Sequence, residues 1–208
     1  MIYIYLIILI NIIVYVLPFI FTFDKDVSIR GELIDSRMVM NSYLAKDNRA
    51  IRGGEWYRFF TANFVHGDIF HLLFNMLAFF SLSASWINYL NAFLGGKISD
   101  IALGSTIIPI YLICGWAGYY LSYKRSKLPS VGSSAAIFGL WGAVTIFDVF
   151  SGNINQIFSS LINIAIIYYI TKMTGMIDNN AHIGGFVAGL LIGLGSLMSI
   201  IAFGVVRV

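Results

Sequence analysis

The sequence predicts an all-α polytopic membrane protein with six transmembrane helices. Hydrophobic residues make up 59% of its 208 residues, and charged residues make up only 11%. Soluble domains carry roughly 25% charged residues, so a water-soluble fold of this length is excluded. The hydrophobicity is continuous along each segment and lacks the period-2 alternation of a transmembrane β-barrel. The spanning elements are therefore expected to be helices, which satisfy their own backbone hydrogen bonds in lipid.

Six uncharged segments give the order of the expected helices: 1–23, 69–96, 101–123, 128–147, 149–171 and 179–206. Each reaches the roughly 20 residues that a helix needs to cross the bilayer core. The first segment lacks a basic start and a small-residue cleavage site, so we interpret it as a retained helix and not as a signal peptide. The fourth segment is the least regular, because Pro129 and Gly132 lie near its start.

Residues 24–58 form the one long polar stretch. This stretch holds seven basic and six acidic residues, and apolar residues such as Leu33, Met38 and Ile51 lie between them. The mixture favours an amphipathic first loop at the membrane surface, and the alternative is a solvated linker. We expect the whole chain, 1–208, to form a single membrane domain. The net charge of +3 is small and its Lys and Arg residues are scattered, so no nucleic acid partner is expected.

Four polar side chains lie just inside the starts of the second, fourth and sixth segments: His71, Asn75, Ser134 and His182. These three segments cross the membrane in the same direction, so their starts share one side. At about 1.5 Å per helical residue, the four residues lie about 5 to 10 Å beyond the last flanking charge. Polar and ionisable groups at such depth are costly and usually functional. The pattern indicates a site in one layer below one face of the bilayer.

Small residues at four-residue spacing mark one face of the fourth segment and one face of the sixth. The ridges are Ala135, Gly139 and Ala143 in the fourth segment, and Ala181, Gly185, Gly189 and Gly193 in the sixth. Such ridges let two helix backbones approach closely. If the two ridges meet, Ser134 and His182 come within hydrogen-bonding distance. The alternative is plain helix packing, with a buried histidine bonded to a carbonyl group.

A serine beside a histidine indicates nucleophilic catalysis. A neutral histidine can take the proton of a serine hydroxyl, which is otherwise a poor nucleophile. The oxyanion then needs hydrogen-bond donors, and His71 and Asn75 share one helix face four residues apart. Asp148 lies about 21 Å along a helix from Ser134 and Asp178 is expected at the water boundary, so we expect a Ser–His dyad and not a triad.

Three motifs on three segments resemble those of rhomboid intramembrane serine proteases. They are the family's His-x4-His-x3-Asn, its Gly-x-Ser, and its Ala-His-x-x-Gly-x-x-x-Gly. In chain order, the matching residues are His66, His71, Asn75, Gly132, Ser134, Ala181, His182, Gly185 and Gly189.

The resemblance implies a role for each of these residues. Ser134 would be the nucleophile and His182 the general base. His71 and Asn75 would form the oxyanion hole, and His66 would support them. Phe138 stands where the family often has an aromatic residue that packs on the catalytic histidine, while Ala135 replaces the glycine that usually follows the nucleophile.

The resemblance also implies an architecture, a substrate class and a location. It covers about residues 55–195 and corresponds to the minimal six-helix form. The substrates would be transmembrane segments of other proteins in the lipid bilayer, and no cofactor or metal is expected. The protein would lie in the plasma membrane of a prokaryote, with the active site opening to the extracytoplasmic side. The charge distribution predicts the opposite orientation, because eleven Lys and Arg residues flank that side and two flank the other.

A second hypothesis comes from a different class of protein. Intramembrane histidines could instead serve a non-catalytic membrane factor or a small transporter, in which they bind or relay. Transporters often contain inverted repeats. The first and second halves of this sequence show no such similarity.

Overall fold

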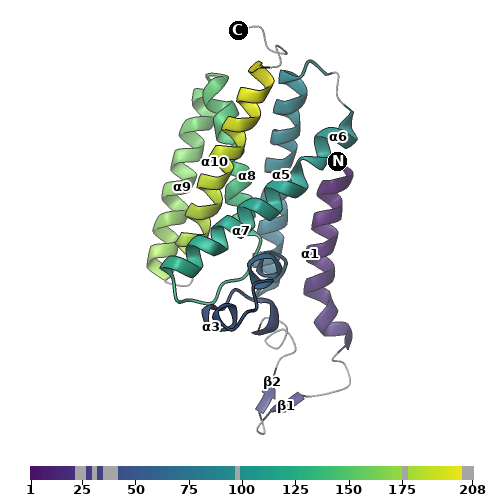
Figure 1. The fold of residues 1–208 in the computed structure, drawn as a ribbon, viewed down its shortest axis with the longest axis vertical. Coiled ribbons are helices and arrows are strands. Elements are labelled where there is room, and N and C mark those ends of the chain that lie inside the picture. The colour runs from purple at the N-terminus through teal and green to yellow at the C-terminus, as the bar shows by residue number, and fades with distance from the viewer. Residues whose placement is uncertain (22–26, 30–31, 35–41, 97–98, 175–177, 203–208) are drawn as a thin grey trace.

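The computed structural model describes residues 1–21, 27–29, 32–34, 42–96, 99–174 and 178–202, and it shows a helical bundle (Figure 1). In chain order the elements are α1 (Ile2–Phe21), β1 (Val27–Ile29), β2 (Glu32–Ile34), α3 (Asn48–Arg52), α4 (Arg58–Thr61), η1 (Ala62–Phe64), α5 (Ile69–Phe93), α6 (Asp100–Ser105), α7 (Ile107–Arg125), α8 (Ser134–Phe150), α9 (Ile154–Thr174) and α10 (Asn179–Ala202). The predicted all-α polytopic membrane fold is confirmed.

Each uncharged segment of the sequence contains a helix. Among the described residues, four helical stretches are long and apolar enough to cross a membrane: α1, α5, α6 with α7, and α10. Helix α8 is shorter, with 17 residues. The third segment is interrupted between α6 and α7. Pro109 has no N–H to donate to the Ser105 carbonyl, which weakens the helix at this point.

The fourth segment begins as a helix later than the sequence predicts. It was expected to start at residue 128, but α8 starts at Ser134 and extends to Phe150. Pro129 and Gly132 explain the difference. Proline disfavours a helix in the residue before it, and Gly132 has a φ of 111°, a non-helical conformation that is unfavourable for a residue with a side chain. Ser130, just before this turn, forms an isolated antiparallel bridge with Lys46.

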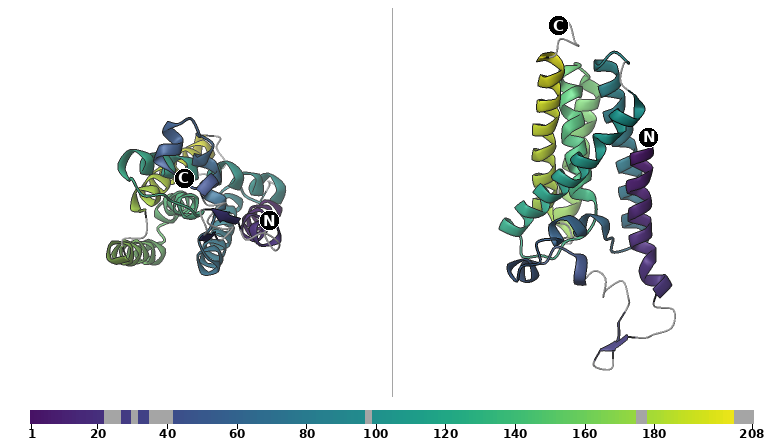
Figure 2. Two further views of the ribbon diagram at one scale, coloured as in Figure 1. Left: turned by 90° about the horizontal axis from the view of Figure 1, so that it is seen from below. Right: turned by 45° about the vertical axis from the view of Figure 1, so that its right-hand side comes forward.

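The predicted amphipathic first loop is described only in part, because residues 24–26, 30–31 and 35–41 lie outside the described residues. Strands β1 and β2 pair antiparallel, with Val27 opposite Ile34, and lie beyond one end of the bundle (Figures 1 and 2). This hairpin was not predicted, although Val27, Ile29 and Ile34 are β-branched residues that favour strands. Within the loop, Asn48 Nδ2 donates to the Tyr123 carbonyl oxygen of α7 at 3.2 Å. Just after the loop, Phe59 of α4 contacts Trp116, Tyr120 and Tyr123 of the same helix. A position at the membrane surface stays a prediction.

Helix α8 lies at the centre of the bundle. Helices α10, α7 and α5 all pack against it, and α7 crosses the bundle obliquely (Figure 1). The outer faces of the surrounding helices expose large apolar side chains such as Phe74 of α5, Phe158 of α9 and Leu191 of α10. An exposed apolar surface of this extent is suited to contact with lipid.

The two small-residue ridges meet between α8 and α10. A Cβ atom on Gly185 would lie 2.0 Å from the carbonyl oxygen of Ala135, and one on Gly189 would lie 1.7 Å from the carbonyl oxygen of Gly139. No side chain fits at these distances, so glycine is required for this approach. The start of α10 is thereby held against the start of α8, which positions the site described next.

Candidate active site

Ser134 and His182 face each other where α8 and α10 begin. Ser134 is the first residue of α8, directly after the Gly132 turn. Its Oγ atom lies 2.9 Å from Nε2 of His182 on α10. The histidine is nearly buried, with 9% of its surface exposed. The pair therefore has the geometry in which a neutral imidazole accepts the hydroxyl proton.

Phe138 fixes the plane of the imidazole. It lies one helical turn after Ser134, and its ring stacks on the His182 ring with a centroid distance of 4.3 Å and an interplanar angle of 6°. The other ring nitrogen of His182, Nδ1, is buried and has no hydrogen-bond partner among the described residues. Stacking on Phe138 is therefore the contact that sets the plane of this imidazole, since no carboxylate among the described residues bonds to Nδ1.

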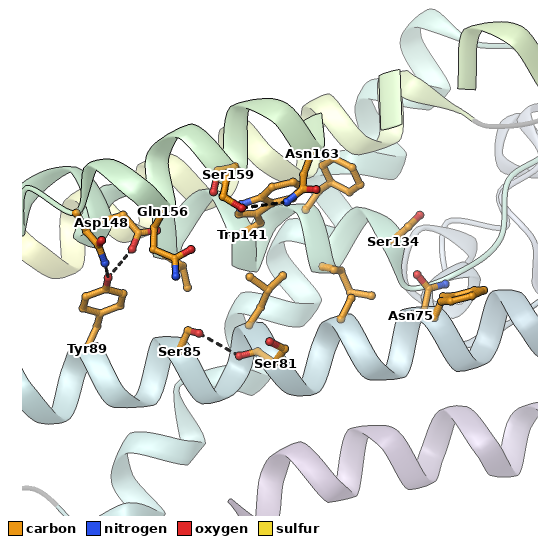
Figure 3. A pocket seen from close by; sticks show the side chains of 18 residues that line it. Asn75, Ser81, Ser85, Tyr89, Ser134, Trp141, Asp148, Gln156, Ser159 and Asn163 are labelled. Carbon is orange, nitrogen blue, oxygen red and sulfur yellow. Dashed lines mark hydrogen bonds between the residues drawn. The ribbon is translucent and has the colours of Figure 1, made fainter. Parts of the chain in front are cut away.

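His71 and Asn75 lie on the other side of Ser134. Both belong to α5, and both approach the Gly132 turn: a Cβ atom on Gly132 would lie 2.7 Å from Nε2 of His71 and 3.4 Å from Nδ2 of Asn75. The Asn75 side chain points toward Ser134 across the cavity (Figure 3). Its Nδ2 group is buried and has no partner among the described residues. An unpaired buried donor is costly, and its place beside Ser134 leaves it free to donate to an oxygen atom that binds there.

His66 contacts the residue just before Ser134. It lies between η1 and α5, and its Nε2 atom is 3.4 Å from both the backbone nitrogen and Oγ of Ser133. Burial, together with the smaller effect of the neighbouring His71, lowers the pKa of His66 to about 3. His66 is therefore neutral at pH 7 and can accept the Ser133 N–H. Its ring also meets the His71 ring edge-on at 5.1 Å.

Comparisons with known proteins identify the family of this chain. A family model described as the Rhomboid domain matches residues 53–199. This chain belongs to the rhomboid family. Over 149 residues it is 34% identical to rhomboid protease GluP of Bacillus subtilis, which covers 70% of this chain and 27% of that protein. Over 152 residues it is 32% identical to RHOMBOID-like protein 4 of Arabidopsis thaliana, covering 70% of this chain and 35% of the relative.

A relative from another group is Rhomboid-like protease 5 of Toxoplasma gondii. It is 28% identical over 177 residues, which is 79% of this chain and 19% of that protein. The chain thus spans between about a fifth and a third of these relatives. Some similar plant proteins carry organellar names, such as RHOMBOID-like protein 6, mitochondrial, of Arabidopsis thaliana.

Tyr119 is a site residue that the sequence analysis missed in this rhomboid chain. Its hydroxyl donates to the carbonyl oxygen of Gly132 at 2.6 Å and lies 3.3 Å from that of Ala62. The Gly132 N–H in turn donates to the Ala62 carbonyl oxygen at 2.9 Å. Together these bonds hold the turn that presents Ser134. A tyrosine in an aromatic-rich transmembrane segment gives no signal that could have identified it.

A second missed feature is a polar cluster around Lys46. This side chain is fully buried, and its Nζ atom donates to the Leu128 carbonyl oxygen at 2.8 Å and lies 3.9 Å from a carboxylate oxygen of Asp178. Burial lowers the pKa of Lys46, which the nearby Asp178 and Asp47 carboxylates oppose. Ser122 and Ser130 also donate to Asp178. Through the bond from Ser130, Asp178 connects the loop before α8 to the start of α10, and its position at the water boundary stays a prediction.

A cavity of about 610 Å³ extends from the site between α5 and α9 (Figure 3). Ser134 and Asn75 lie at one end of it, and Asp148 and Tyr89 lie at the other. Side chains of α8 line the cavity between these two ends. Within the described part of the chain, no group of three or more His, Cys, Asp or Glu side chains is placed to hold a metal ion.

Proposed function

We propose that this rhomboid chain is an intramembrane serine endopeptidase that cleaves transmembrane segments of other proteins through a Ser134–His182 dyad. The observation that carries the proposal is the 2.9 Å contact between Ser134 Oγ and His182 Nε2 inside a helical membrane bundle. His182 takes the hydroxyl proton while Ser134 attacks the scissile carbonyl carbon. Breakdown of the tetrahedral intermediate releases the amine product with that proton, and water then hydrolyses the acyl-enzyme.

The oxyanion of this intermediate would meet three donors. They are Nδ2 of Asn75, the imidazole of His71 and the backbone N–H of Ser134, which belongs to the first turn of α8 and has no intrahelical acceptor. The positive end of the α8 dipole points to the same place. These donors are fixed before substrate binds, so they stabilise developing charge without reorganisation.

Labelling with a fluorophosphonate probe tests the nucleophile directly. The purified protein is expected to incorporate the probe at Ser134, and His182→Ala should strongly slow the reaction. Ser151→Ala provides a control, because Ser151 is exposed at the far end of α8. A non-catalytic membrane factor or transporter would show no labelling of Ser134, and that result would reject the proposal.

Single removal of an oxyanion donor should lower activity without abolishing it. Asn75→Ala and His71→Ala are each expected to reduce kcat on the order of 10- to 1,000-fold, because the remaining donors still stabilise the oxyanion. Asn91→Ala is the matched control, since Asn91 is exposed on the same helix, α5, far from the site. Cleavage rates of a fluorogenic transmembrane substrate report the effect. Unchanged rates in both variants would make these residues purely structural.

We further propose that the protein lies in a prokaryotic plasma membrane with the site opening outside the cytoplasm. In a Cys114→Ala background, Lys127→Cys before α8 should react with a membrane-impermeant maleimide on intact cells. Ser151→Cys after α8 should react only after permeabilisation. Both positions are exposed and flank one helix. The reverse pattern would show that the distribution of Lys and Arg sets the orientation.

A further inference from the structure

Asp148 is a buried acidic group that the dyad does not use. It lies in the last turn of α8 with 4% of its surface exposed. The Tyr89 hydroxyl donates to one of its carboxylate oxygens, and Asn153 lies 3.5 Å from that hydroxyl. Among the described residues, no Lys or Arg forms an ion pair with it.

Helix stability does not explain an acid at this position. Burying a carboxylate without a cationic partner is costly. A negative charge in the last turn of a helix also opposes the helix dipole, which favours cations there. Asp148 is therefore unfavourable on both counts in the isolated chain, and a cation supplied from outside would relieve both.

The carboxylate faces the same cavity as the nucleophile. Asp148 and Ser134 are 14 positions apart on α8, which corresponds to about 21 Å along the helix. Figure 3 shows Tyr89 and Asp148 at one end, with the side chains of Ser85, Gln156 and Asn163 lining the walls from α5 and α9 toward Ser134. The cavity thus gives a continuous path from the reacting atoms to this acid.

We propose that Asp148 and Tyr89 form a subsite for a Lys or Arg side chain of the transmembrane substrate, a preference that builds on the proposed protease function. A substrate helix lying along α8 places this cation about 14 residues from the scissile bond. If the four residues that follow the scissile bond toward Asp148 are extended, the separation falls to about 9 residues. The Tyr89 ring adds a π face beside the carboxylate.

The proposed topology supplies a reason for such a cation. It places the Asp148 end of α8 at the cytoplasmic face, where the flanks of transmembrane segments carry an excess of Lys and Arg. A substrate bound with its scissile bond at Ser134 brings that flank to Asp148. The subsite would then set the distance between the cleaved bond and the cationic flank of the substrate.

Peptide binding to a Ser134→Ala variant in nanodiscs tests the subsite without any need for cleavage. A series of transmembrane peptides would each carry one Lys, placed 5 to 17 residues from the scissile bond on the side that faces Asp148. Each Lys peptide would be compared with a peptide that has Gln at the same position. Lys is expected to tighten binding about tenfold at one register within 9 to 14 residues. In Ser134→Ala/Asp148→Asn this preference should vanish, while the affinity for the Gln peptide stays the same and shows that the variant is folded.

Asp100→Asn is the matched acidic control, because Asp100 is exposed at the start of α6 and its loss should leave the preference intact. Equal affinity for Lys and Gln peptides at every position would overturn the subsite, and so would a preference that survives Asp148→Asn. Cleavage of the Gln peptide by the unmodified protein reports the protease function separately. A Lys preference without cleavage of either peptide would leave the subsite standing and reject the protease.

Discussion

Replacing Ser134 or His182 by alanine is expected to lower peptide-bond cleavage by at least about 10⁴-fold, while the protein stays folded in detergent. The two side chains act as one unit across the 2.9 Å contact, so the double variant should be no worse than either single one. The measurement is turnover of a fluorogenic transmembrane substrate by each purified variant. Thermal melting serves as the folding control.

One result would remove the dyad from the mechanism. Substantial turnover by purified Ser134→Ala, above that of the double variant, would require another nucleophile. Ser133 is the nearest alternative, but its hydroxyl is directed to His66 and not to His182. In the Ser133→Ala variant, Ser134 should accordingly still react with fluorophosphonate. This variant is not a neutral control, because it loses the contact between Ser133 and His66.

Adding a single methyl group at Gly189 should be strongly damaging. The Cβ of Gly189→Ala would lie 1.7 Å from the Gly139 carbonyl oxygen, and that of Gly185→Ala would lie 2.0 Å from the Ala135 carbonyl oxygen. Since these are backbone atoms of α8, the helices must separate. Overpacking usually costs about 1–3 kcal/mol, and we expect the upper part of this range or more. Both the melting temperature and the cleavage rate should fall, because separation also moves His182 away from Ser134.

Gly195→Ala is the matched control for this prediction. It lies on the same helix, and a Cβ there would meet no atom within 4 Å. It should melt like the unmodified protein and retain full activity. Normal melting and activity of Gly189→Ala would contradict the close contact between α8 and α10. An equal loss in Gly195→Ala would show that any added methyl group on α10 is harmful.

The helices were predictable because a backbone in lipid has no water to bond to and must satisfy its hydrogen bonds within the protein. An uncharged segment of about 20 residues must satisfy its own hydrogen bonds, so each segment contains a helix. Pro129 and Gly132 marked the start of the fourth segment as irregular, but the absence of charge from residue 128 onward did not show that α8 begins only at Ser134. The break near Thr106 likewise depends on Pro109 inside an otherwise continuous apolar segment.

The site was predictable where spacing along a helix determines which residues share a face. The four-residue interval between His71 and Asn75 and the two glycine-containing ridges are properties of single helices. Tyr119 and Lys46 were missed for the opposite reason. Their partners are carbonyl oxygens of other segments, and carbonyl groups are present at every residue. Only the folded arrangement of the loops before α8 reveals those contacts.

The length of α8 has a consequence for the surrounding lipid. A helix of 17 residues is about 25 Å long, whereas the hydrocarbon core of a bilayer is roughly 30 Å thick. If α8 spans the bilayer in the proposed orientation, the shortfall would lie at its Ser134 end, where the turn of residues 126–133 would take up the remaining depth. Water would then reach a peptide bond below the level of the lipid headgroups. We therefore expect the proposed hydrolysis to depend on membrane thickness, because a thicker bilayer would cover the entrance and a thinner one would expose it.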